Sequence, residues 1–166
     1  QELYFKDYWD YINNLSVEHI EFTNDKDSIV FTEHVKVSSS NLTATSGQRL
    51  LFQPNAFNRV TQIPTRYKTR TLDFEIERGY TDREEFIINI DPKFNIEAIP
   101  NAVDVTTKFG SYSFSIEKLS DNQLRYKRTQ ILNKGSYNKD EYNDFRDFMS
   151  TIVRHDKSKM VLISKT

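Results

Sequence analysis

The sequence predicts a mainly β fold: an antiparallel β-sandwich with one amphipathic helix near the C-terminus and a short helix at the N-terminus. Three observations lead to this prediction. Apolar and polar residues alternate with a period of two along most of the chain, turn-forming residues separate these stretches, and a period of 3.6 occurs only near the two ends. Aromatic residues, which favour strands, make up 13% of the chain.

The N-terminal stretch has the spacing of a helix. Large apolar residues recur every three or four positions, at Tyr4, Phe5, Tyr8, Trp9, Ile12 and Leu15. This period predicts an amphipathic helix over residues 2–15, although so many aromatic rings leave a strand open as an alternative. The chain begins at Gln1 rather than at a methionine, so we interpret it as a piece of a longer polypeptide. We expect residues 1–17 to be a helical linker from an upstream domain and residues 18–166 to be one β-sandwich domain.

The predicted strands share one apolar and one polar face, which is typical of antiparallel sheets with one face in water. They cover residues 29–37, 50–52, 72–76, 86–90, 103–105, 112–116 and 124–132. In the last of these we expect Arg125, Lys127 and Thr129 on the solvent side. Turn-forming pairs such as Ser46-Gly47 and Lys134-Gly135 separate the strands.

The second helix is predicted over residues 138–155. Its apolar stripe consists of Tyr142, Phe145, Phe148, Met149, Ile152 and Val153. Asn138, followed three residues later by Glu141, predicts a capping box at its start. The apolar run at residues 160–163 then predicts a closing strand.

The composition excludes several classes of function. The chain has 166 residues and a net charge of −1, with acidic and basic residues mixed, so no field of one sign is available to attract nucleic acid. No apolar run is long enough to insert across a bilayer. The absence of cysteine excludes disulfides and thiol nucleophiles, and the four scattered glycines form no phosphate-binding loop. We expect no cofactor and no metal ion.

Histidines and paired acids are the remaining candidates for chemistry. His19, His34 and His155 show no metal-binding spacing, and each has a structural interpretation: His34 is predicted on a solvated strand face and His155 at a helix C-terminus, where it suits the dipole. The carboxylate pairs Glu84-Glu85 and Asp140-Glu141 open a strand and cap a helix. We therefore predict no catalytic residue, and expect that the chain alone is not an enzyme.

One stretch combines basic and aromatic residues, as strands that bind nucleic acid do. It contains Arg125, Tyr126, Lys127, Arg128 and Lys134. Because the chain is close to neutral overall, we interpret this stretch as a solvated strand face balanced by nearby acids.

The C-terminal half resembles a known bacterial family. The residues that carry the resemblance are Ile96 to Pro100, Phe109 to Ser113, Leu124 to Arg128, Lys134 to Tyr137, Tyr142 to Phe145 and Asp156 to Leu162, with Arg70 and Glu77 to Tyr80 fitting an earlier part of the pattern. The family is the β-sandwich domain of unknown function that follows the transglutaminase-like core in large exported bacterial proteins. The resemblance covers roughly residues 18 to 164.

The resemblance implies a non-catalytic C-terminal accessory domain that packs on, or supports, a catalytic core in the same polypeptide. It also implies the periplasm or the bacterial cell surface as the location. Two alternatives stay open: a structural or adhesion-type module, and a glycan-binding sandwich with carbohydrate as its partner. We predict Tyr4, Phe5, Tyr8 and Trp9 as the contact with the upstream domain, the alternative being that these rings pack on the domain's own core.

Overall fold

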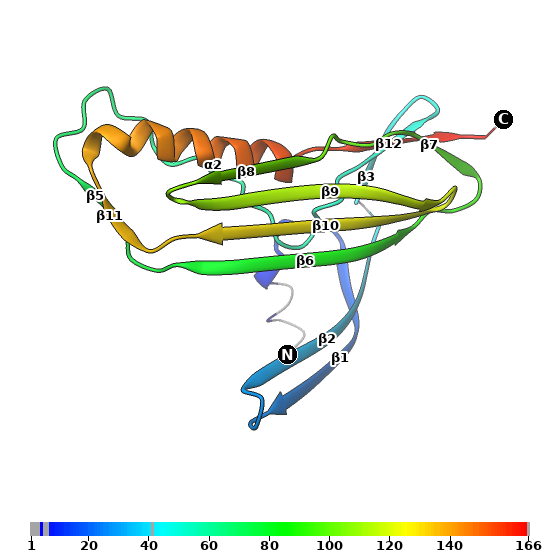
Figure 1. The fold of residues 1–166 in the computed structure, drawn as a ribbon. Coiled ribbons are helices and arrows are strands. Elements are labelled where there is room, and N and C mark those ends of the chain that lie inside the picture. The colour runs from blue at the N-terminus through cyan, green and yellow to red at the C-terminus, as the bar shows by residue number, and fades with distance from the viewer. Residues whose placement is uncertain (1–3, 5–6, 41, 166) are drawn as a thin grey trace. The chain divides into compact units, whose positions relative to one another are not determined.

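The computed structural model describes residue 4, residues 7–40 and residues 42–165, which form two compact units, 1–44 and 45–166. The first unit is an antiparallel hairpin of β1 (Leu15–Asp25) and β2 (Val30–Ser39), preceded by a short helical stretch (Figure 1). The predicted mainly antiparallel β fold with a C-terminal helix is confirmed.

The second unit contains the remaining strands and the main helix, with β3 at the boundary. Its strands are β3 (Thr43–Ser46), β4 (Arg49–Phe52), β5 (Phe74–Ile76), β6 (Tyr80–Asn89), β7 (Phe94–Ala98), β8 (Val103–Thr107), β9 (Gly110–Ser120), β10 (Gln123–Leu132), β11 (Gly135–Tyr137) and β12 (Met160–Ser164). A 3-10 turn, η1 (Lys139–Glu141), leads into helix α2 (Tyr142–Asp156).

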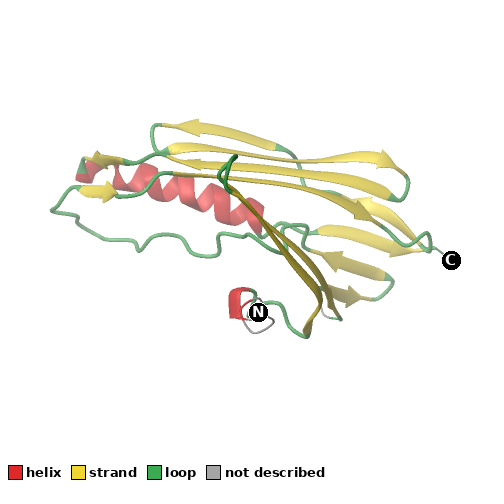
Figure 2. Ribbon diagram, turned by 90° about the horizontal axis from the view of Figure 1, so that it is seen from below, coloured by secondary structure: helices red, strands yellow, loops and turns green. Residues whose placement is uncertain are grey.

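The second unit is built on a long four-stranded sheet with the order β6-β10-β9-β8. Figure 2 shows α2 against one face of this sheet, with a second sheet beyond the helix C-terminus. The helix contributes Phe148, Met149 and Ile152 to the larger core cluster, where they meet inward residues of the sheet such as Phe114 and Tyr126. The covered face therefore holds the main core.

The second sheet, with the order β3-β4-β12-β7, covers the other end of the same face. Its Met160 and Leu162 form a smaller core cluster with Leu124 of β10 and Ile90. The long sheet is thus covered by a helix at one end and by a sheet at the other. The change of cover from a helix to a sheet follows from the sequence, because the 3.6-residue period of apolar side chains in α2 is replaced by a period of two in β12.

The C-terminal helix and its start are as predicted. The Asn138 side chain accepts a hydrogen bond from the Asp140 amide at 3.0 Å, and the Glu141 carboxylate accepts one from the Asn138 amide at 3.1 Å. This capping box satisfies amides that the first turn leaves without helical partners.

A long segment without regular structure, residues 53–73, runs along α2 (Figures 1 and 2). Side chains of the helix hold its carbonyl groups: Arg146 Nε donates to Pro64 O at 2.8 Å, and the Tyr142 hydroxyl donates to Thr65 O at 2.9 Å. Lys157 Nζ donates to Thr61 O at 3.0 Å. These bonds satisfy backbone groups that no strand pairs.

The N-terminal helix is shorter than predicted. Among the described residues only Tyr4, Asp7 and Tyr8 are helical, the chain turns after them, and β1 already begins at Leu15. Asn14, six residues after the last helical residue, adopts a left-handed conformation with φ 53°, which asparagine tolerates and which excludes a helix that continues to Leu15.

Three residues expected on apolar strand faces are exposed instead: Phe31 lies within β2 and is 59% exposed, and the other two lie outside the strands. Leu72 precedes β5 and is 75% exposed, and Ile29 lies in the hairpin turn and is 91% exposed. In both cases the strand is shorter than the apolar pattern predicts, because the pattern continues into a neighbouring turn or loop.

Candidate functional site

The most unusual chemistry in the described chain is a charged cluster on the covered face of the long sheet. Strand β10 turns alternate side chains inward, so that Arg128 and Gln130 follow Leu124 and Tyr126 into the core. Arg128 is 2% exposed and Asp156, at the end of α2, is 1% exposed. A buried charge is costly unless a partner neutralises it, so the surroundings of these two residues decide what they do.

Arg128 and Asp156 form a bidentate ion pair. Arg128 Nε lies 2.7 Å from Asp156 Oδ1, and the second contact, from a terminal guanidinium nitrogen to Oδ2, is 2.8 Å. Parallel donors and acceptors of this kind match the planar guanidinium fork to the carboxylate. The pair joins the middle of β10 to the last residue of α2.

Asp156 also accepts hydrogen bonds from two other parts of the fold. The Tyr112 hydroxyl on β9 donates to Oδ1 at 2.9 Å, and the Val60 amide in the segment 53–73 donates to Oδ2 at 2.8 Å. The backbone carbonyl of Asp156 accepts from the Gln53 side chain at 2.8 Å. One carboxylate thus connects the helix, the sheet and the long segment.

The remaining donors of Arg128 are occupied as well. Its Nη1 contacts Glu84 on β6 at 2.9 Å, and Nη2 donates to the Gln130 side chain. Gln130 in turn donates to the Tyr80 hydroxyl at 2.7 Å, and Glu84 accepts from Asn58. The cluster therefore extends from the core to the edge of the sheet.

The charges of the cluster control its protonation. Burial alone would lower the pKa of Arg128, but hydrogen bonds from Arg128 to Asp156 and the charges of Asp156 and Glu84 raise it above its ordinary value. Burial, and then the charge of Asp156, raises the pKa of the Tyr112 hydroxyl well above its ordinary range. Both shifts favour a charged Arg128 and a neutral, hydrogen-bond-donating Tyr112, which are the forms that the observed bonds to Asp156 require.

This arrangement favours a structural role over a catalytic one. Both oxygens of Asp156 accept two hydrogen bonds each, and the Arg128 guanidinium is enclosed by Asp156, Glu84 and Gln130. An entering ligand would have to break these bonds before it could contact either charge.

The interpretation of Arg128 as part of a solvated strand face is wrong. Arg125 and Lys127 do lie on the outer face, beside Glu85, but Arg128 points inward. The period of two in β10 already contained this signal, since Arg128 falls in register with Leu124 and Tyr126. Asp156 gave the same kind of signal, since it follows Ile152 by four positions and Val153 by three and so falls on the apolar face of the helix, but the predicted helix ended one residue before it.

The fold divides the first of the two carboxylate pairs. Glu84 faces Arg128, whereas Glu85 contacts Arg125 and Lys127 on the other face of β6. Glu141 takes part in the capping box and pairs with Lys108. Adjacent acids on opposite faces of a strand cannot act together on one substrate.

The three histidines lie on three different elements. His19 and His34 lie on the hairpin, and His155 lies on α2 with its ring 6.2 Å from Tyr112 and 6.1 Å from Phe114. Burial lowers the pKa of His155 below its ordinary value. Within the described residues, no group of three His, Cys, Asp or Glu side chains could hold a metal ion.

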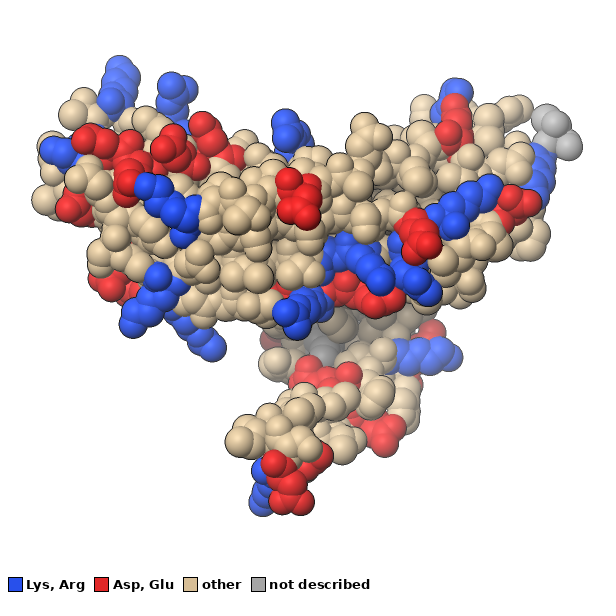
Figure 3. All heavy atoms as spheres, viewed as in Figure 1, with Lys and Arg blue, Asp and Glu red and all other residues tan. Residues whose placement is uncertain are grey.

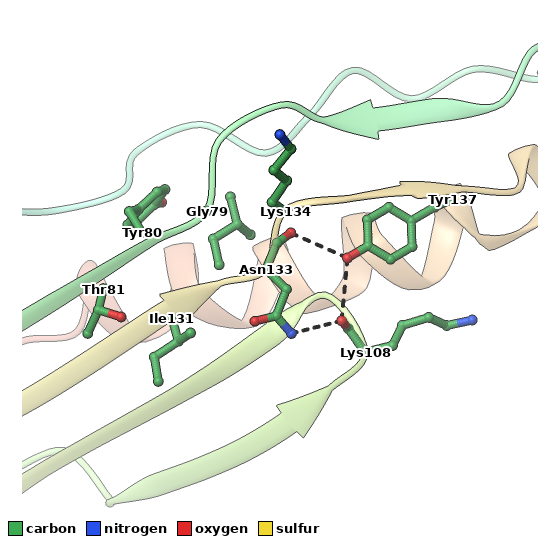
Figure 4. A pocket seen from close by; sticks show the side chains of 9 residues that line it. Gly79, Tyr80, Thr81, Lys108, Ile131, Asn133, Lys134 and Tyr137 are labelled. Atoms are coloured by element: carbon green, nitrogen blue, oxygen red, sulfur yellow. Dashed lines mark hydrogen bonds between the residues drawn. The ribbon is translucent and has the colours of Figure 1, made fainter.

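An open hollow lies at the end of the long sheet, between β6, β10 and β11. Its lining includes Tyr80, Lys108, Asn133, Lys134 and Tyr137. Figure 4 shows the Tyr137 hydroxyl directed at the backbone carbonyls of Lys108 and Asn133, while the two lysine side chains point in different directions. The amino group of Lys108 is paired with Glu141, so the two lysines do not converge on a single anion.

The predicted interdomain residues lie in the first unit. Tyr4 and Tyr8 are 53% and 59% exposed and their rings stack with centroids 6.1 Å apart, while Trp9 is partly exposed and meets Tyr8 edge-on at 5.8 Å. Phe5 lies outside the described residues. Their role as an interdomain contact stays a prediction.

A family model described as a domain of unknown function with a solved structure, DUF3858, matches residues 48–162. This chain belongs to the DUF3858 family. The match spans β4 to β12 and so includes every residue of the charged cluster. Comparison with curated proteins and with solved structures gave no match. In the described part of the chain no helix is long and apolar enough to cross a membrane.

The first prediction concerns the ion pair of the DUF3858 domain. Arg128→Met should lower the free energy of unfolding by about 3–5 kcal/mol, because it leaves the Asp156 charge buried without its partner. Arg125→Met is the matched control on the outer face of β10, where contacts to Glu85 and Glu117 are 3.4 and 3.5 Å long, and it should cost less than about 1 kcal/mol. Urea unfolding measures both, and equal losses would contradict a special role for Arg128.

The second prediction compares two fully buried tyrosines on the covered face. Tyr112→Phe removes a hydrogen bond to a charged carboxylate and should cost about 1.5–3 kcal/mol. The Tyr126 hydroxyl has no hydrogen-bond partner among the described residues, so Tyr126→Phe should leave stability unchanged or raise it by about 1 kcal/mol. Thermal melts of the two variants give the comparison, and a larger loss for Tyr126→Phe would show that the two hydroxyl environments are assigned wrongly.

Proposed function

We propose that this chain is a non-catalytic accessory domain of a multidomain, exported bacterial protein, and that it packs on or supports a transglutaminase-like core in the same polypeptide. The observation that carries the proposal is the closed charged cluster. Arg128, Asp156 and Glu84 are the charges that could have formed a reaction centre, and their hydrogen bonds connect the layers of the domain instead.

The placement of the other titratable groups supports the same proposal. A nucleophile needs a base within hydrogen-bond reach. The Ser158 hydroxyl donates to the backbone carbonyl of His155 and not to its ring, and the chain contains no cysteine. Any acyl-transfer chemistry of the parent protein is then the work of its core, at the periplasm or the cell surface.

Glycan binding and a structural or adhesion-type role remain the alternative hypotheses. A glycan-binding sandwich uses an exposed aromatic ring as a platform. Tyr67 is 50% exposed, but its ring already meets Tyr142 at 5.8 Å and the Arg70 guanidinium at 5.6 Å. Because neighbouring side chains of the same domain engage this ring, the accessory role is better supported.

The third prediction tests the contact with an upstream domain. Trp9 is the single tryptophan of the chain and is partly exposed, so acrylamide should quench its fluorescence in the 166-residue protein. In a longer chain that carries the upstream region, quenching of Trp9 should fall, with the matching Trp9→Phe variant used to subtract other tryptophans. Equal quenching of Trp9 in both chains would count against the proposed packing at this site.

A further inference from the structure

The hairpin of β1 and β2 has an apolar face that its own two strands cannot cover. Val17 pairs with Val37 and Ile20 pairs with Val35, so these side chains share one face. In the described residues this sheet contains two strands only. A two-stranded hairpin is marginally stable in water by itself, and a cover over its apolar face would stabilise it.

The outer end of the hairpin carries three exposed apolar side chains, which we call the tip patch: Phe22, Ile29 and Phe31. They are 37%, 91% and 59% exposed. The rings of Phe22 and Phe31 stack across the strands with centroids 5.7 Å apart. Exposed apolar residues gathered at one place indicate an interaction surface more strongly than residues scattered singly.

One residue of the tip patch has a strained backbone conformation. Ile29 has φ 54°, a left-handed conformation that is rare for a β-branched residue and costs of order 1–3 kcal/mol. The Asp25 carboxylate holds the turn before it by accepting hydrogen bonds from the amides of Asp27 and Ser28 at 3.0 and 3.1 Å. Asparagine or glycine at position 29 would relieve the strain, so the isoleucine side chain serves something other than the turn.

Charge indicates the kind of surface that the tip would fit. Residues 1–44 contain eight acidic and three basic residues, a net charge of −5, whereas residues 45–166 contain 16 acidic and 20 basic residues, a net charge of +4. Glu21, Asp25, Asp27 and Glu33 lie close to the tip patch, with Lys26 as the basic residue in the turn. Figure 3 shows this mainly acidic group at the end of the hairpin.

We propose that the tip patch docks into an apolar groove rimmed by basic side chains on the neighbouring domain of the same polypeptide. The proposal rests on the proposed accessory function and names the element that makes the contact. Ile29 and the two stacked rings supply the apolar contact area, and the surrounding carboxylates meet the basic rim. The same carboxylates disfavour a second copy of the hairpin and an anionic bilayer as partners, because like charges would face each other.

The experiment places a reactive thiol at the tip of the otherwise cysteine-free chain. Asp27→Cys provides this tip thiol, and Asp121→Cys provides a control thiol at the turn between β9 and β10, where the Asp121 side chain is 92% exposed. Maleimide labelling is compared between the 166-residue protein and the longer chain with the upstream region, in which any native cysteine is replaced. Labelling of the tip thiol should slow by at least about tenfold in the longer chain, while labelling of the control thiol stays unchanged.

A second variant separates docking from folding. Ile29→Asn, added to Asp27→Cys, suits the left-handed turn, so the melting temperature of the 166-residue protein should hold or rise. The same change removes the exposed side chain, so protection of the tip thiol in the longer chain should be lost. Raising NaCl from about 50 mM to about 500 mM should also weaken the protection, since it screens the carboxylates from a basic rim.

Four results would overturn the inference. Equal labelling of the tip thiol in both chains, with the upstream region still shielding Trp9, would leave the accessory function intact and exclude the tip as its contact. Protection of the tip thiol that survives Ile29→Asn would show that the exposed Ile29 side chain does not make the contact. Protection of the 166-residue protein that grows with its concentration would indicate a second copy, and protection by phosphatidylcholine–phosphatidylglycerol vesicles would indicate a bilayer. A failure of the accessory function itself differs from all four, since neither Trp9 nor the tip thiol would then respond to the upstream region.

Discussion

The ion pair between Arg128 and Asp156 is the constraint on which the larger unit depends. It joins the central strand of the long sheet to the end of the helix that covers it, and the same carboxylate holds Tyr112 and the Val60 amide. Replacing such a pair by apolar residues is often neutral, so its contribution is better sought in specificity than in raw stability. These bonds tie α2, residues 53–73 and the long sheet to one carboxylate.

The hairpin unit differs from the second unit in how it exposes its apolar side chains. In the DUF3858 region the large side chains of β10 and α2 are enclosed, whereas the hairpin leaves Phe31 and Ile29 in solvent. The first unit is acidic and the second is basic, which the net charge of −1 for the whole chain conceals. The closed core of the second unit and the exposed apolar side chains of the hairpin are the features on which the proposed accessory role rests.

The sequence alone predicts those parts of the fold that depend on hydrophobic periodicity and on local helix capping. The alternation in β10, the apolar stripe of α2 and the capping box of Asn138 each act over a few residues, and all three are present. The charged cluster was not foreseen, because Arg128 and Asp156 are separated by 28 positions and meet only through tertiary packing. Ile29 was predicted in a strand but lies in the hairpin turn, because a local left-handed backbone conformation overrides an apolar pattern that is typical of a strand.

Native-state hydrogen exchange of the Val60 amide tests the central claim most directly. Val60 lies in a segment without regular structure, and its amide donates to Asp156 at 2.8 Å. If the cluster fixes this segment to the core, the Val60 amide should exchange as slowly as the amides of β10, and much more slowly than that of the exposed loop residue Ile63. Exchange of Val60 at the rate of Ile63 would mean that the segment opens independently of the core, and would contradict the account.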